Sequence, residues 1–343
     1  MRIIVTGSCG LVGFNTCRYL SGKGHDIFAI DNLERSDLLG HEVSPARKYY
    51  NETELSKLGI HNIRWDISDE RTWDRIKEAD AIIHLAGQCG VPTSIANPKR
   101  DFEINTVGTF LGLECARRTG AKFILASTNK VYPIHEGWHL EDKRWRWTYD
   151  SWHKYGIPIT FSSAGIKSRT PYGASKYAAD ILVQEYGKTY GLQTACFRMS
   201  CIYGENQMGF AEQGWAAHFV IATLKDQPIQ IFGDGYQVRD MLWVEDLIKA
   251  YESFINKDTG PAVYNIGGGP DFTLSLNECL DIIEKVTGKR SQVTYHDWRP
   301  ADQRVYTSDI LPTQLDLDWR PTIAPLEGLE RLVKWATPIL DIF

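Results

Sequence analysis

The sequence predicts an α/β protein with a doubly wound parallel sheet and a smaller C-terminal α/β domain. Three observations support this prediction. Over the first two-thirds of the 343 residues, short apolar runs alternate with amphipathic stretches. A glycine-spaced turn, from Gly7 to Gly13, directly follows the first apolar run. In the last third, helical patterns are separated by segments marked by Gly and Pro, which indicates a change of architecture.

The strands expected in the sheet are short, apolar and largely β-branched, as in a sheet buried on both faces. Because helical stretches lie between them, we expect parallel strands with right-handed crossovers. The expected strands are Arg2–Thr6, Asp26–Ile30, Ile63–Asp66, Ala81–Leu85, Lys122–Ser127 and Thr194–Met199, and the helices between them are Leu11–Lys23, Arg71–Glu78, Asp101–Thr119 and Tyr172–Tyr190.

The last third is expected to form a smaller α/β domain. Its expected helices are Glu212–Lys225, Val244–Asn256, Ser275–Thr287 and Leu326–Ala336, with one strand at Val263–Ile266.

One long segment, residues 135–170, has no clear period and is rich in tryptophan. Loops of this length in a compact domain are usually functional or disordered, and tryptophan argues against disorder. We therefore expect an ordered excursion near the functional site. Its tryptophans are Trp138, Trp145, Trp147 and Trp152.

Composition excludes several classes of function. The net charge is −5 without a prominent basic tract, so no nucleic-acid partner is expected. No apolar run approaches the ~20 residues of a membrane span, and the chain passes directly from Met1 into an apolar strand. We therefore expect a cytoplasmic protein without a membrane partner. The seven cysteines contain no CxxC pair, which predicts reduced thiols and no metal site.

The glycine turn has the context of a dinucleotide site. Gly7, Gly10 and Gly13 follow a strand and open a helix, so backbone N–H groups can approach a pyrophosphate. Asp31 ends the second predicted strand, where a carboxylate accepts bonds from a ribose diol and repels a 2′-phosphate. NAD is therefore expected rather than NADP, although Arg35 lies close enough to blur that preference.

A second motif predicts hydride chemistry at a hydroxyl-bearing carbon. A phenol with a pKa of ~10 is a poor base at neutral pH, and a nearby cation lowers that pKa. Lys176 follows Tyr172 by one helical turn, so both side chains lie on one helix face. Tyr172 is then expected to take a proton from a sugar hydroxyl while hydride leaves the same carbon for nicotinamide. Thr128 is the predicted hydroxyl that orients the substrate oxygen, with Ser127 as the alternative.

The spacing GxxGxxG resembles the extended branch of the short-chain dehydrogenase/reductase superfamily. Asp66-Ile67 after the third strand, the turn His84 to Gln88 and Asn105 on the central helix are also similar to that family. For His84 itself we favour a satisfied core histidine over a ligand. The resemblance implies these cofactor-binding residues: Gly7, Cys9, Gly10, Leu11, Gly13, Asp31, Asn32, Asp66, Ile67, Leu85, Ala86, Gly87, Asn105, Tyr172 and Lys176.

The domain organisation follows from these motifs. We expect a dinucleotide-binding Rossmann domain over residues 1–199, with segments near 230–265 returning to it. Residues 200–343 are expected to form a smaller domain that binds a nucleotide sugar.

The family resemblance is compatible with epimerase, 4,6-dehydratase and reductase reactions, and individual residues argue against two of them. A 4,6-dehydratase carries Asp-Glu directly after the Ser/Thr, whereas this chain has Asn129 and Lys130. A net reductase needs exchangeable NADPH, which Asp31 disfavours. Epimerisation with tightly bound NAD that is not consumed is the reaction that remains.

The chain is most similar in detail to the CDP-tyvelose (CDP-paratose) 2-epimerases. This resemblance implies inversion of carbon 2 of a CDP-linked hexose through a 2-keto intermediate. It rests on Thr93–Pro98, Ser127–Tyr132, Gln213–Trp215, Gln237–Asp240 and Asp302–Val305. The substrate-binding residues implied are Gln88, Thr128, Asn129, Lys130, Arg239, Arg299 and Asp302, the two arginines by a guanidinium fork on phosphate.

Two alternatives remain open from the sequence. Many 4-epimerases have asparagine and proline where this chain has Cys201 and Glu205, so a UDP- or CDP-hexose 4-epimerase is the second choice. A catalytically silent dinucleotide-binding protein is the third. The resemblance also implies a homodimer through the helices Asp101–Thr119 and Tyr172–Tyr190.

Overall fold

The fold was taken from a computed structural model of the full chain. It describes residues 1–40, 42–133, 140–142, 146–149, 156–159, 170–211, 213–299 and 302–343. The chain divides into two compact units. Unit 1 comprises residues 1–131, 169–198 and 248–264, and unit 2 comprises residues 132–168, 199–247 and 265–343. The assignment of a dinucleotide and a sugar to separate parts of the chain stays a prediction.

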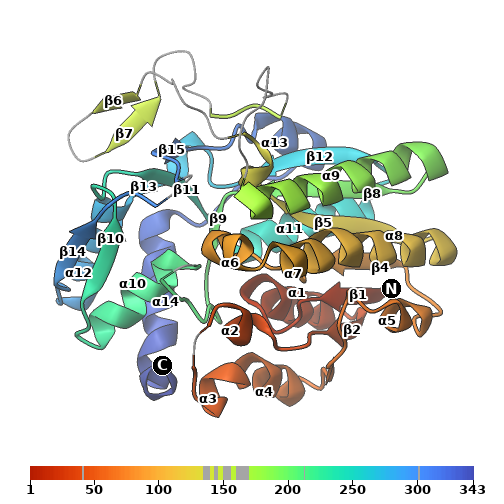
Figure 1. The fold of residues 1–343 in the computed structure, drawn as a ribbon, viewed down its shortest axis with the longest axis horizontal. Helices are drawn as coiled ribbons and strands as arrows, with labels where there is room; N and C mark the ends of the chain where they lie inside the picture. The colour runs from red at the N-terminus through yellow and green to blue at the C-terminus, as the bar shows by residue number, and fades with distance from the viewer. Residues whose placement is uncertain are drawn as a thin grey trace. The chain divides into compact units, whose positions relative to one another are not determined.

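Unit 1 is built on a seven-stranded sheet of order β12-β8-β5-β4-β1-β2-β3 (Figure 1). The pairings of β1 with β2 and β4, of β2 with β3 and of β4 with β5 are parallel. The direction of winding reverses between β1 and β4, which marks the ligand-binding edge of such a sheet. The strands are β1 (Arg2–Thr6), β2 (Asp26–Ile30), β3 (Asn62–Ile63), β4 (Ala81–His84), β5 (Lys122–Thr128), β8 (Thr194–Met199) and β12 (Ala262–Ile266).

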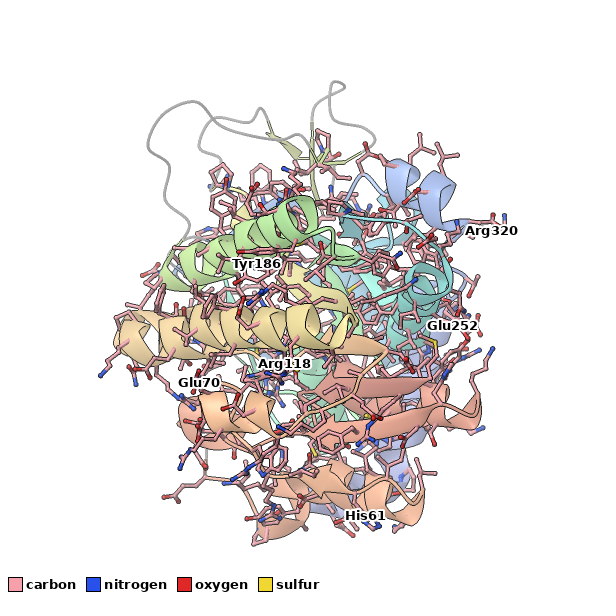
Figure 2. All side chains as sticks on the ribbon, turned by 90° about the vertical axis from the view of Figure 1, so that its right-hand side faces the viewer. His61, Glu70, Arg118, Tyr186, Glu252 and Arg320 are labelled. Atoms are coloured by element: carbon pink, nitrogen blue, oxygen red, sulfur yellow. The ribbon has the colours of Figure 1, made fainter. Side chains whose placement is uncertain are left out.

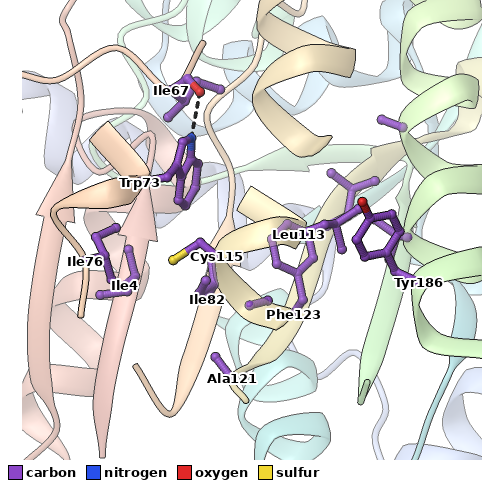
Figure 3. Close-up of a cluster of buried hydrophobic side chains, with 14 of the residues drawn as sticks. Ile4, Ile67, Trp73, Ile76, Ile82, Leu113, Cys115, Ala121, Phe123 and Tyr186 are labelled. Atoms are coloured by element: carbon purple, nitrogen blue, oxygen red, sulfur yellow. Dashed lines mark hydrogen bonds between the residues drawn. The ribbon is translucent and has the colours of Figure 1, made fainter. Parts of the chain in front are cut away.

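Helices cover both faces of this sheet, because alternate residues of each strand point to opposite sides. On one face, Tyr19 of α1 (Leu11–Gly22) donates from its hydroxyl to Glu252 of α11 (Val244–Asn256) at 2.8 Å. On the other face, α5 (Glu70–Asp74), α8 (Gly108–Thr119) and α9 (Thr170–Tyr190) bury an apolar cluster. Figure 3 shows this cluster, in which the indole N–H of Trp73 donates to the carbonyl of Ile67 at 2.8 Å.

The predicted α/β sheet is confirmed. β1, β2 and β8 have the expected bounds, and β5 ends one residue later than expected, at Thr128. The strand expected at Ile63–Asp66 is shorter and ends at Ile63, because the chain turns at Asp66, whose side chain accepts from Ser68. The helix expected at Asp101–Thr119 is interrupted. It consists of α7 (Pro98–Phe102), a π-helical turn η1 (Glu103–Val107) and α8.

Among the described residues, α13 (Leu311–Leu317) of unit 2 and four short helices of unit 1 were not predicted. The four helices of unit 1 are α2 (Arg35–Leu38), α3 (Pro45–Lys48), α4 (Tyr50–Lys57) and α6 (Val91–Ala96). The asparagine Asn51 of α4 donates to the carbonyl of Cys9 at 2.9 Å, so α4 packs against the glycine turn.

Unit 2 contains small sheets and four helices. Its core joins Tyr203 and Trp243, whose rings meet edge to face at 5.4 Å. Helix α12 begins with a capping box in which Ser275 and Glu278 satisfy each other's backbone N–H groups. The elements are β9 (Cys201–Tyr203), β11 (Val238–Trp243), β13 (Thr273–Ser275) and β15 (Val305–Tyr306) in one sheet, the pairs β10 (Ile229–Phe232) with β14 (Val293–His296) and β6 (Leu140–Asp142) with β7 (Trp147–Tyr149), and α10 (Trp215–Leu224), α12 (Leu276–Thr287), α13 (Leu311–Leu317) and α14 (Pro325–Ala336).

The expected excursion over residues 135–170 lies largely outside the described residues, as do Trp138, Trp145 and Trp152. Trp147 is described, and its indole N–H donates to Asp234 at 2.8 Å within unit 2. Among the described residues, no helix has the length and apolar character needed to cross a membrane.

Candidate active site

The glycine turn joins β1 to α1 with backbone packed directly on backbone. Gly7 has φ of +71°, and its N–H donates to the carbonyl of Ile30 at 2.8 Å, which ties the turn to β2. A Cβ on Gly13 would lie 1.9 Å from the carbonyl oxygen of Gly7, so only glycine lets α1 start this close to the turn. The N-cap residue, Gly10, makes no side-chain hydrogen bond to the first turn. The N–H groups at this helix end therefore suit a phosphate.

Asp31 follows β2 and is connected to the same turn. Its carboxylate accepts from the N–H of Cys9 at 3.0 Å and from the N–H of Leu33 at 2.8 Å. Burial raises the pKa of Asp31, and these two N–H groups oppose that effect, as does the positive charge of Arg35. The geometry fits a carboxylate that receives a ribose diol.

Asp66 and Asn32, both expected at the adenosine half, belong to one ion-pair network. Arg100 donates to Asp66 at 2.7 Å and also pairs with Glu34, to which Asn32 donates at 2.9 Å. Burial acts to raise the pKa of Asp66, but the bonds from Ser68 and Arg100 together lower it. The structure thus gives the Asp66 carboxylate protein partners, while its adenine contact stays a prediction.

The loop after β4 packs against the glycine turn. The N–H groups of Leu85 and Ala86 donate to the hydroxyl oxygen of Thr6 at 3.2 and 3.1 Å. A Cβ on Gly7 would lie 2.7 Å from the nitrogen of Ala86. Residues from the ends of β1 and β4 therefore meet where the winding of the sheet reverses, which is where such folds hold dinucleotides.

An unsatisfied acceptor lies at the inner end of this cradle. Oδ1 of Asn105 is buried and has no hydrogen-bond partner among the described residues. A Cβ on Gly87 would lie 3.0 Å from this oxygen and 3.7 Å from Nζ of Lys176. The uncapped helix end, the glycine cradle and the Asp31 carboxylate, together with this acceptor, fit the dinucleotide that the sequence predicts.

Thr128, Tyr172 and Lys176 come together in unit 1. Thr128 is the last residue of β5, and the other two lie in the first turns of α9. The side chains of Thr128 and Tyr172 are hydrogen-bonded to each other. The alternative hydroxyl, Ser127, is fully buried and donates to Asp180 at 2.6 Å. Thr128 is therefore the hydroxyl beside the phenol.

The charges of this group differ from expectation in one respect. Burial raises the pKa of Tyr172 well above its ordinary value, and the bond with Thr128 opposes this. The pKa of Tyr172 is raised although it was expected to be lowered, because burial and the negative charges of Cys89 and Asp101 act in the same direction. Burial also lowers the pKa of Lys176 to about 8, with Cys89 and Asp101 acting in the opposite direction. The phenol therefore needs further positive charge, which an oxidised nicotinamide supplies when bound.

His84 occupies a core position, as expected, but only one of its nitrogens is satisfied. Nδ1 lies 3.0 Å from Oγ1 of Thr6. Because that oxygen accepts from two backbone N–H groups, its own proton points to Nδ1, and the imidazole proton is on Nε2. Nε2 is buried without a partner among the described residues. Burial lowers the pKa of His84 to about 3.

Three residues near this group were missed by sequence reasoning: Cys89, Asp101 and Ser175. Cys89 acts electrostatically on both Tyr172 and Lys176, and burial raises its own pKa. Asp101 could have been found as the residue one helical turn before Asn105, on the same face. Gln88, expected to bind substrate, instead turns inward, where its amide donates to Asp101 at 3.0 Å and pairs with the backbone of Gly90.

Unit 2 contains Arg239 and Arg299, which the resemblance places at the substrate diphosphate, and Asp302, which it places at a ribose. Arg239 donates to Asp302 at 2.8 Å, and its side chain is 14% exposed. Arg299 donates to the carbonyl of Ala211 at 3.3 Å and lies over the ring of Phe232, 4.1 Å from its centroid. The structure thus forms an Arg239–Asp302 ion pair, and a phosphate role for the arginines stays a prediction.

Known proteins match this chain over its whole length. The model of the NAD dependent epimerase/dehydratase family matches residues 3–267. The chain is 33% identical to the CDP-paratose 2-epimerase of Salmonella typhi, covering 99% of this chain and 100% of that protein. It is 29% identical to the UDP-glucuronate 4-epimerase of Thermodesulfobacterium geofontis, covering 99% and 97%. The crystal structure of the Thermotoga maritima UDP-glucose 4-epimerase with UDP-glucose superposes with a TM-score of 0.80 at 26% identity, covering 99% and 100%.

The chain belongs to the NAD dependent epimerase/dehydratase family. It is an NAD-dependent enzyme of the nucleotide-sugar type, and the resemblance to extended short-chain dehydrogenases and to the 2-epimerases is confirmed at that level. Its relatives are named for different carbons and different nucleotides, so the substrate is taken up as a proposal.

Proposed function

We propose that the protein is an epimerase that inverts carbon 2 of a CDP-linked hexose, of the CDP-paratose/CDP-tyvelose or CDP-glucose/CDP-mannose type, with NAD retained throughout. The observation that carries the choice of carbon and nucleotide is the full-length similarity to a CDP-paratose 2-epimerase. The convergence of Thr128, Tyr172 and Lys176 supports the reaction type.

In the proposed reaction, Thr128 donates a hydrogen bond to the oxygen on carbon 2, and the ionised Tyr172 takes the proton of that hydroxyl. The bound nicotinamide supplies a two-electron acceptor for the hydrogen on carbon 2. Lys176 stabilises the phenolate by its positive charge. The 2-keto sugar is then reduced from its other face, and Tyr172 returns the proton to oxygen.

Dehydration is disfavoured by the residues after Thr128. An acid and a base are needed to eliminate water, and Asn129 and Lys130 provide no carboxylate there. Asn129 directly follows β5 and is 8% exposed, and the family resemblance assigns this sequence position to the acid of a dehydratase.

The substrate-binding residues are proposed from the family resemblance, for each unit by itself. Arg239 and Arg299 would bind the diphosphate, and Asp302 the ribose, because guanidinium groups pair with phosphate oxygens in bidentate fashion. Gln88, Asn129 and Lys130 would approach the hexose. The inward amide of Gln88 makes it the weakest of these assignments.

The test is incubation of the purified enzyme with CDP-glucose and with CDP-paratose, followed by NMR of the sugar in H₂O and in D₂O. We expect inversion at carbon 2 and no deuterium at that carbon, because the carbon-bound hydrogen leaves and returns as hydride. Deuterium at carbon 2 would instead show deprotonation, and would contradict the proposed chemistry.

The second candidate is a 4-epimerase, which the relatives named for carbon 4 favour. Inversion at carbon 4 alone, with CDP- or UDP-hexoses, would establish this candidate and remove the first. A preparation with bound NAD and no turnover of any nucleotide sugar would contradict both.

A further inference from the structure

A buried carboxylate outside the predicted constellation holds the residues around Lys176 in place. Asp101, on α7, is 1% exposed. One of its oxygens accepts from the amides of Gln88 at 3.0 Å and Asn105 at 3.2 Å. The other accepts from the hydroxyl of Ser175 at 2.5 Å. Asp101 therefore joins the loop after β4, the π-helical turn and the helix that carries Tyr172 and Lys176.

The charge of Asp101 has no cation among these partners, which are two amides and a hydroxyl. Lys176 interacts electrostatically with several titratable groups besides Asp101: Asp180 from α9, His84 from β4, Cys89 from the following loop and Cys196 from β8. Burial favours the neutral form of both thiols and of His84. Asp180 is paired with Arg198 at 2.8 Å. Burial also raises the pKa of Asp101, and the bonds from Ser175 and Gln88 and the charge of Lys176 oppose that effect. Ionised Asp101 is thus the carboxylate whose charge is left for Lys176.

Asp101 also fixes the orientation of Asn105. The carbonyl of Gln88 and the carboxylate of Asp101 only accept, so both require the NH₂ group of Asn105, at 3.1 and 3.2 Å. Its Oδ1 must then point the other way, and it lies beside Gly87 on the same side as Nζ of Lys176.

We propose that Asp101 is a positioning residue of the hydride-transfer site, which supplies the counter-charge of the Lys176 ammonium and turns Oδ1 of Asn105 toward the cradle. The effect of Asp101 on turnover rests on the proposed function. The effect of its negative charge on the pKa of Lys176 does not rest on that function, so the two effects are tested separately.

The first test is titration of Lys176 in the NAD-loaded protein by NMR of ¹³Cε-lysine, with the resonance assigned from Lys176→Arg. In Asp101→Asn, the pKa of Lys176 is expected to fall by about one pH unit, since a neighbouring negative charge is lost. The asparagine fits the site, because Ser175 can accept from it while donating to the carbonyl of Tyr172 at 3.0 Å. An unchanged pKa of Lys176 overturns the proposal, whatever the substrate is.

Two matched variants separate charge from packing. Ser175→Ala removes a donor but keeps the carboxylate, so the Lys176 titration should stay as in the wild type. Asp246→Asn neutralises a buried carboxylate in unit 2 that accepts from Thr322 and Ile323, and should lower stability without moving that titration. A Lys176 shift in either variant as large as in Asp101→Asn contradicts the proposal.

Two further measurements complete the test. In the wild type, ¹³Cγ-aspartate NMR should show Asp101 ionised over the range in which Lys176 titrates, and a neutral Asp101 overturns the proposal even where Asp101→Asn does not fold. With an active substrate, the alkaline limb of the kcat profile should move to lower pH in Asp101→Asn and stay in place in Ser175→Ala. If the alkaline limb stays in place in both variants, the proposed effect of Asp101 on turnover is excluded, while its proposed effect on the charge of Lys176 is not.

Discussion

At the scale of single residues, burial and hydrogen bonding have opposite effects on the pKa of Tyr172. The phenol is 8% exposed, and desolvation raises its pKa more than its hydrogen bond with Thr128 lowers it. The sequence motif carries the cation one turn away but carries no information on how deeply the helix is buried. Reactivity at neutral pH is therefore a property of the whole site, with Lys176 as the part that the motif reveals.

Tyr172→Phe should keep the fold and the bound NAD while losing activity on the order of 10²–10⁴-fold, because the proton acceptor is removed. The matched control is Tyr186→Phe on the same helix, which loses only a bond to Glu114 and should retain activity. Sugar turnover and NAD content are measured on both variants. Near-normal turnover in Tyr172→Phe would exclude it as the base.

His84 should make the protein sensitive to acid. Burial lowers its pKa to about 3, so between the unfolded value of about 6.5 and pH 3 the folded state binds fewer protons than the unfolded state. Its contribution to stability is intact above pH 6.5 and is lost as the pH falls. Between pH 6.5 and 5 this loss amounts to roughly 2 kcal/mol.

The check is denaturant unfolding of wild type and His84→Phe between pH 5 and pH 8. The phenyl ring suits the site, where Trp73 and Phe123 have ring centroids 5.8 and 5.7 Å from the imidazole. The variant's free energy of unfolding should decline less on acidification. Equal declines in both proteins would show that His84 does not titrate in this way.

At the scale of elements, the close approach of α1 to the glycine turn requires that Gly13 has no Cβ. A Cβ at Gly13 meets the carbonyl of Gly7 at 1.9 Å, whereas one at Gly22 on the same helix meets nothing within 4 Å among the described residues. Gly13→Ala must displace the turn, and should lose bound NAD and soluble expression. Gly22→Ala should be neutral or stabilise by up to ~1 kcal/mol. Both variants are compared with the wild type by their NAD content, measured by absorbance, and by their Tm. Full NAD occupancy in Gly13→Ala would contradict the role of the turn.

Elements with strong local signals were predictable from the sequence. β1, β2 and β8 have the expected bounds because their mostly apolar runs are flanked by turn-forming residues. The π-helical turn η1 and the helix α4 were not predictable. The first changes the hydrogen-bond period without changing the residue pattern, and the second is stabilised by contacts such as Asn51 to Cys9, which are remote in sequence.

At the scale of the whole molecule, exposed apolar side chains gather on two neighbouring helices. Figure 2 shows α8 and α9 side by side in unit 1, with Tyr186 labelled on α9. The ring of Tyr186 meets those of Phe110 and Tyr190 edge to face, at 6.4 and 5.0 Å. Phe110 is 41% exposed, Tyr190 52% and Ile181 40%. Such a surface is typical of an interface between copies.

We therefore expect a homodimer through these helices. The double variant Phe110→Glu with Ile181→Glu should be monomeric in sedimentation equilibrium, because it places charge in an apolar contact. Leu315→Glu on α13, at a position 77% exposed, is the control and should leave the mass unchanged. A wild-type protein that is monomeric at micromolar concentration would refute the expected assembly.

The site as a whole was partly predictable. Three of its residues belong to motifs that can be read from the sequence. Thr128 follows an expected strand, and Tyr172 and Lys176 lie one turn apart on an expected helix. The network around Asp101 was not predictable, because its members are ordinary polar residues that only the crossing of α7, η1 and α9 brings together.

Gly87 has one consequence for protein engineering. Its bare Cα leaves room between the oxygen of Asn105 and the nitrogen of Lys176, and a methyl group there would meet them at 3.0 and 3.7 Å. Gly87→Ala would thus place a methyl group between these two atoms, at the end of the cradle where we propose that the nicotinamide binds. It offers a way to make an occupied but silent version of the protein, suited to trapping sugar ligands for structural work.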